Sequence, residues 1–180
     1  MFEGKQYFEG FRTLSTNGID KPVLNGFKML GRLEGNRIPL TSTGALGVDR
    51  ILKEKVRGAP DIDGMAVTNG KMVQVIMWNY HDDIMDAEPN QVKLEVKLSA
   101  NLSKASVTHY RIDKTHSNAY TKWVSMGSPQ NPTEAQISDL KKAAELELLE
   151  PAKSVNVEKG ILPLTFELPR HSVSLVEVRY

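Results

Sequence analysis

Histidine, aspartate and serine side chains crowd one stretch near the middle of the chain. The stretch contains His109, Asp113, His116 and Ser117, followed by Asn118. These are the residue types of a hydrolytic triad, in which a base activates a serine hydroxyl, but a triad is defined by geometry and not by composition. The sequence around Ser117 also lacks a nucleophile elbow. We therefore expect Asp113, Ser117 and Asn118 to cap turns and a short helix.

A second cluster, Tyr80-His81-Asp82-Asp83 with Asp86 close behind, places several carboxylates at the end of an apolar run. Hard cations prefer several oxygen ligands, yet the spacing of these aspartates differs from that of a calcium-binding loop. The sequence therefore predicts a structural turn at a strand end, with a buried pairing of His81 and an aspartate as one form of it. We expect no metal site.

Two aromatic-Glu-Gly units, Phe2-Glu3-Gly4 and Phe8-Glu9-Gly10, stand at the start of the chain. Most carboxylates lie at the surface and are merely solvated. Taken alone, Glu3 and Glu9 are therefore interpreted as solvated loop residues.

The composition excludes several classes of protein. The 180 residues carry a net charge of +1 and no cysteine, so a generally basic nucleic-acid-binding face, disulfides and thiolate metal sites are not expected. No apolar run approaches the roughly 20 residues that span a bilayer, and the N-terminus has no signal-peptide pattern. The compartment is left undetermined.

One amphipathic helix is predicted over about residues 21–33. Pro22 fits its first turn, and Gly31 and Gly35 end the pattern. Apolar residues recur at helical spacing at Val23, Leu24, Phe27 and Leu30. A lone helix behind an irregular leader cannot bury this stripe by itself, so we expect its partner to lie outside these 180 residues.

The rest of the chain is predicted to be mainly β. Asn69-Gly70 favours a hairpin, and clean alternation marks residues 92–98 and 162–168. Further strands are expected at 73–80, 105–112 and 173–178. The region 113–147 is predicted to be a helical insertion, in which Tyr120 and Trp123 either pack in a core or lie at the mouth of a binding site, and packing is favoured. Together these patterns predict an antiparallel β-sandwich.

Five segments of the chain, in order, resemble the β-xylosidases and α-L-iduronidase relatives of glycoside hydrolase family 39. They are YFEGFRTLSTNGIDKPVLNGFKMLG (7–31), VRGAPDIDGMAV (56–67), VIMWNYHDD (75–83), HYRIDKTHSNAYTKW (109–123) with MGSPQNPTEAQISDL (126–140), and LPLTFELPRHSVSLVEV (162–178). The resemblance implies a TIM barrel followed by a β-sandwich. Residues 1–34 would be the tail of the barrel, with its last helix, and residues 35–180 the accessory sandwich.

This resemblance implies that the chain is only the C-terminal portion of such an enzyme. Retaining glycosidases use two carboxylates about 5–5.5 Å apart, and the family takes both catalytic glutamates from earlier barrel strands. We therefore expect no catalytic residue in this chain and no hydrolysis by it alone. The family pattern further implies that Phe2 and Glu3 bind the sugar, although Gly4 departs from the second glutamate of that pattern.

The expected function is therefore that of an accessory sandwich in a retaining β-xylosidase-like hydrolase, with no cofactor. Its partners would be the missing barrel and, through it, a xylo-oligosaccharide or another glycoside. The alternative is a stand-alone carbohydrate-binding or protein-interaction module, which needs exposed, coplanar aromatic residues on one sheet face. Trp78 is expected to be buried, which disfavours that alternative. A third expectation is self-association through the apolar stripe of the 21–33 helix.

Overall fold

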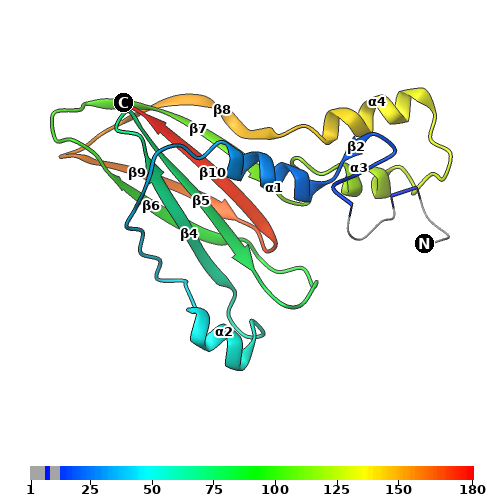
Figure 1. Ribbon diagram of the computed structural model, residues 1–180, viewed down its shortest axis with the longest axis horizontal. Helices are drawn as coiled ribbons and strands as arrows, with labels where there is room; N and C mark the ends of the chain where they lie inside the picture. The colour runs from blue at the N-terminus through cyan, green and yellow to red at the C-terminus, as the bar shows by residue number, and fades with distance from the viewer. Residues whose placement is uncertain (1–6, 9–12) are drawn as a thin grey trace. The chain divides into compact units, whose positions relative to one another are not determined.

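The computed structural model describes residues 7–8 and 13–180 (Figure 1). The described part of the chain divides into two compact units. The first unit comprises the described residues of Met1–Arg32 together with Arg111–Glu147, and the second comprises Leu33–Tyr110 and Leu148–Tyr180. Each unit has a hydrophobic core of its own. No helix in the described ranges is long and apolar enough to cross a membrane.

Most strands belong to one sheet. Within residues 13–180, six strands are hydrogen-bonded in the order β3-β4-β5-β10-β7-β8, and β6 pairs with β9 in a separate sheet. The strands of the larger sheet are β3 (Asn36–Ile38), β4 (Asp61–Thr68), β5 (Met72–Tyr80), β10 (Ser172–Arg179), β7 (Lys104–Ile112) and β8 (Glu147–Asn156), and those of the smaller are β6 (Asn90–Lys97) and β9 (Ile161–Leu168).

The core of the second unit lies between these two sheets. Side chains alternate along a strand, so Val73, Val75 and Met77 of β5 point from one sheet toward the core. Val96 of β6 and Leu162 of β9 meet them from the other sheet. The pairs β3–β4, β4–β5, β5–β10 and β6–β9 are antiparallel. The predicted mainly β fold with antiparallel sheets is confirmed.

The predicted hairpin at Asn69-Gly70 joins β4 to β5, with Thr68 opposite Val73. Its turn differs from the type I′ turn that the dipeptide favours, because the positive φ falls on Gly70 (84°) and not on Asn69. Asn69 instead uses its side chain, whose Oδ1 accepts the backbone N–H of Lys71 at 3.0 Å. The side chain thus closes the turn by local hydrogen bonding, as asparagine commonly does.

The first unit is built around aromatic packing. Its elements are β1 (Ser15–Thr16), β2 (Ile19–Asp20), α1 (Pro22–Gly31), α3 (Ala119–Ser125) and α4 (Glu134–Ala143). Trp123 is buried beside Phe8, with ring centroids 5.7 Å apart, and its Nε1 donates to the Pro129 carbonyl at 2.9 Å. Ile19 and Leu140 complete this core. The packing role predicted for Trp123 is therefore correct.

Helix α1 begins at Pro22, as expected, but its two faces differ from the prediction. The buried face carries Asn25 and Met29. The predicted stripe remains largely in solvent: the side chains of Val23, Phe27 and Leu30 are 50%, 56% and 47% exposed, while Leu24 is half-buried.

Candidate functional site

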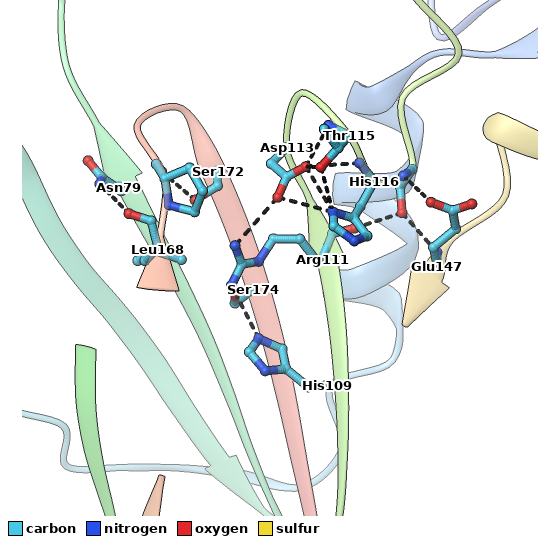
Figure 2. A network of polar contacts seen from close by, with 12 residues as sticks. Asn79, His109, Arg111, Asp113, Thr115, His116, Glu147, Leu168, Ser172 and Ser174 are labelled. Carbon is cyan, nitrogen blue, oxygen red and sulfur yellow. Dashed lines mark hydrogen bonds and ion pairs between the residues drawn. The ribbon is translucent and has the colours of Figure 1, made fainter. Parts of the chain in front are cut away.

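The crowded stretch identified in the sequence forms a closed turn around one carboxylate (Figure 2). Asp113 follows β7 directly, and its Oδ1 accepts the backbone N–H groups of Thr115 at 2.7 Å and His116 at 2.8 Å. The Thr115 hydroxyl and His116 Nδ1 lie 2.9 and 3.0 Å from the same oxygen. On the other side, Arg111 Nη1 lies 3.5 Å from Asp113 Oδ2.

These contacts keep Asp113 ionised. Burial raises the pKa of its carboxyl, but the hydrogen bonds from Thr115 and His116 and the charge of His116 lower it by more, so the pKa lies below its ordinary value. Burial also lowers the pKa of the Arg111 guanidinium, against the opposing attraction of Asp113. A carboxylate with this many donors is positioned to hold a turn and not to exchange protons with a substrate.

The hydroxyl of Ser117 is likewise occupied by the backbone. Its Oγ donates to the Arg111 carbonyl at 2.7 Å and accepts the Glu147 N–H at 2.8 Å, while the Ser117 N–H donates to the Glu147 carboxylate at 3.0 Å. His109 instead contacts Ser174, with Nε2 3.0 Å from Oγ. No triad forms among these residues, and Asn118 caps α3 by accepting the Thr121 N–H, as predicted.

The acidic strand-end cluster is also structural. His81 is buried, with Nε2 3.1 Å from the Gly58 carbonyl and Nδ1 3.1 Å from the backbone nitrogen of Asp83. Asp83 in turn forms an ion pair with Arg170. His81 Nδ1 also lies 3.1 Å from Asp83 Oδ2, but the Asp83 side chain is 44% exposed. The predicted turn and the His81–aspartate pair are therefore present, with only His81 buried. Within residues 7–8 and 13–180, no group of three or more His, Asp or Glu side chains is arranged to hold a metal ion.

An open cavity of about 360 Å³ lies beside this turn, and it is lined by Trp78, Tyr80, His171 and Asp61 among others. The sequence predicts a buried Trp78, and this is wrong because Trp78 is only half-buried. The odd-numbered residues of β5 face the core between the sheets, so Trp78 and Tyr80 share the outer face. Because β5 carries apolar residues on both faces, its sequence does not show which face is buried between the sheets.

The sugar-binding residues implied by the resemblance, Phe2 and Glu3, lie outside the described residues, as does Glu9. Three carboxylates are buried within the described ranges, those of Asp61, Asp113 and Glu177. Asp61 accepts from the Leu46 N–H and from Trp78 Nε1, and Glu177 accepts from Gln74. Each buried carboxylate thus has protein donors of its own.

Comparison with known proteins shows which family the chain resembles. The family model described as "Glycosyl hydrolases family 39" matches residues 3–158. A curated "Beta-xylosidase" from Caldicellulosiruptor saccharolyticus is 30% identical over 175 residues, which cover 94% of this chain and 32% of that protein.

Solved structures show the same fold. The GH39 enzyme from Xanthomonas axonopodis pv. citri aligns with a TM-score of 0.71 at 14% identity, covering 90% of this chain and 31% of its own. A monomeric beta-xylosidase from Caulobacter crescentus CB15 aligns at 0.64 and 19% identity, with 90% and 31% covered. The chain thus spans about a third of the length of these relatives. Because the family model covers most of its length, the chain belongs to glycosyl hydrolases family 39.

Proposed function

We propose that these residues form the C-terminal accessory β-sandwich of a retaining β-xylosidase-like glycoside hydrolase. The observation that carries the proposal is the family match over residues 3–158 in a chain that spans about a third of its relatives. The whole enzyme would release terminal β-xylosyl groups through a covalent glycosyl-enzyme intermediate. In such an enzyme, the sandwich would pack against the catalytic barrel and stabilise it.

The engaged carboxylates support the assignment of catalysis to residues outside this chain. A retaining mechanism needs one carboxylate as nucleophile and another as acid and base, close together across the bond that is cleaved. Asp61, Asp113 and Glu177 are each held by different donors within the fold. Their hydrogen bonds serve the structure of the chain.

Helix α1 supports the proposal that the sandwich portion contacts the barrel. Val23, Phe27 and Leu30 form an exposed apolar stripe on a helix whose other face is buried through Asn25 and Met29. Contiguous exposed apolar groups mark interaction surfaces. We assign this stripe to the barrel, with residues 1–34 as the barrel's tail, and a second copy of the chain is the competing occupant.

A hydrolysis assay tests where catalysis resides. The purified 180-residue chain, mixed with an aryl β-D-xylopyranoside, is expected to release aryl alcohol no faster than buffer does. Turnover that is lost on substituting one of the chain's own carboxylates would contradict the proposal. A barrel with two strand-end glutamates, encoded in the same reading frame ahead of Met1, would support it independently.

Glu3 is proposed to accept hydrogen bonds from sugar hydroxyls in the complete enzyme, with Phe2 beside it. Glu3→Gln should raise KM roughly tenfold, because a charge-assisted hydrogen bond becomes a neutral one. Glu9→Gln, in the second aromatic-Glu-Gly unit, is the matched control and should leave KM unchanged. Equal KM values for the two variants would remove Glu3 from the substrate site.

A specific observation favours a second function, carbohydrate binding by the sandwich itself. The outer face of β5 carries two aromatic side chains, Trp78 and Tyr80, beside an open cavity, which supports this second function.

A further inference from the structure

We propose that the outer face of β5 is a binding site for a pyranose ring of a β-linked oligosaccharide, centred on Trp78 and Tyr80. The choice of a sugar rests on the proposed glycosidase function, whereas the site itself rests on the geometry of the second unit. Nothing in the proposal requires catalysis by this chain or places the site at the catalytic centre.

Sheet register assembles the site from three neighbouring strands. Across β4, β5 and β10, one row reads Asp63, Trp78 and Val173. In the next row Asp61 lies opposite Tyr80, and His171 follows on the turn before β10. Residues directly opposite on antiparallel strands point to the same face. On this face, the two aspartates of β4 therefore lie on one side of the two aromatic residues of β5, and Val173 of β10 with the preceding His171 lies on the other.

Trp78 and Tyr80 are held before any ligand arrives. Trp78 Nε1 donates to Asp61 Oδ2 at 3.0 Å, which fixes the indole by one edge, and Asp61 Oδ1 accepts the Leu46 N–H at 2.8 Å. The Tyr80 hydroxyl donates to Asp82 at 3.1 Å, and its ring meets the His171 ring edge-on at 6.3 Å. Side chains ordered in advance lose little conformational entropy on binding.

The chemistry of the face matches a sugar ring. A pyranose presents C–H groups on its flat faces and hydroxyls around its rim, so it needs apolar platforms with acceptors beside them. Trp78 and Tyr80, two residues apart on one strand, are separated by about 7 Å, so one ring can touch both. The buried Asp61 carboxylate lies at the rim of the platform. The cavity of about 360 Å³ falls at the small end of ligand sites.

A cationic ligand is the competing occupant, because carboxylates and aromatic faces also attract ammonium and guanidinium groups. The local charges oppose it. Arg170 is paired with Asp83, Arg57 lies 4.0 Å from Asp82, and the Asp61 carboxylate already accepts two N–H donors. Asp82 and Asp83 near the cavity thus already have cationic partners, and both oxygens of Asp61 already accept neutral N–H donors, which favours a neutral polyhydroxylated ligand.

The test is binding of xylotriose and cellotriose to the whole 180-residue chain, followed by calorimetry and by amide chemical shifts. We expect weak, saturable binding that perturbs the amides of β5 and β10 around Trp78 and Val173. Tyr80→Ala should weaken it about tenfold, the effect of losing one aromatic platform. Tyr80 is 48% exposed, so this variant is expected to fold.

Tyr120→Ala is the matched control, since Tyr120 is 50% exposed but belongs to the first unit, and it should leave the affinity unchanged. Trp78→Phe keeps an aromatic face without the indole donor and should retain part of the affinity. Absence of saturable binding by both sugars, or equal affinity in Tyr80→Ala and Tyr120→Ala, would overturn the site. So would tighter binding of tetramethylammonium than of either sugar. The hydrolysis assay is independent of these outcomes, so the proposed function can fail or stand separately.

Discussion

At the scale of single residues, Asp113 holds together the turn that follows β7 in the first unit. Replacing it with Asn removes a charge that accepts several hydrogen bonds and that pairs with the buried Arg111 guanidinium. We expect Asp113→Asn to lower the free energy of unfolding by roughly 3 kcal/mol. Denaturant unfolding followed by near-UV circular dichroism measures it, and Asp139→Asn on the exposed face of α4 is the control. Equal midpoints for the two variants would show that the turn does not depend on this charge.

The same residue predicts a dependence of stability on pH. The folded pKa of Asp113 lies below its ordinary value of 3.8. Its ionised form therefore stabilises the fold fully at pH values above the ordinary pKa, and this contribution is lost as the pH falls through the lower, folded value. Acid unfolding of the parent chain should be steeper than that of Asp113→Asn. Parallel acid curves would contradict this assignment.

Local motifs predict individual residues well where the partners are near in sequence. Asn118 caps α3, and the Thr-x-x-Gln spacing of Thr133 and Gln136 forms a capping box at α4. Trp78 is different, because its exposure depends on which face of β5 meets the other sheet. That choice is made by strands far away in the chain, and β5 is apolar on both faces.

At the scale of secondary-structure elements, α1 makes the clearest prediction. Its stripe of Val23, Phe27 and Leu30 is exposed. In the isolated chain the stripe should drive concentration-dependent association, because burial of about 25 cal/mol per Å² of apolar surface favours contact. Phe27→Asp should then sediment as a monomer at concentrations at which the parent chain associates.

Val124→Asp is the control for α1, since Val124 is an exposed apolar residue on α3. It should associate as the parent chain does. A parent chain that remains monomeric at millimolar concentration would remove self-association as a role of the stripe and leave the barrel as its proposed partner.

The elements that sequence patterns miss share one physical property. Helix α2 (Val48–Glu54) buries none of its residues, and its apolar residues, Val48, Ile51 and Leu52, span only one helical repeat, which is too short to stand out as a pattern. Strand β8 is mostly exposed and contains Pro151, which suits an edge strand but interrupts any alternating pattern. By contrast, β6 and β9 alternate cleanly, because each has one face on the core and one in water.

At the scale of the whole molecule, alternation predicts the fold class but not the grouping of the elements. The predicted boundary at residue 34 places one helix apart from everything that follows. In the structure, α1 shares a unit with α3 and α4, and Asn25 donates to the carbonyls of Ser117 and Ala144 at 3.0 and 2.9 Å. A buried asparagine on a helix gives no sign in the sequence of which distant carbonyls it will meet. Whether residues 1–34 also belong to a barrel stays a prediction.

The chain has two tryptophans, and each unit contains one of them. Trp123 is enclosed in the aromatic core of the first unit, whereas Trp78 is half-buried on an outer sheet surface of the second. Their fluorescence should therefore respond unequally to a dissolved quencher such as acrylamide, with Trp123 shielded and Trp78 accessible. The native chain thus contains one intrinsic fluorophore in each unit, so the unfolding of either unit can be followed without attaching a dye.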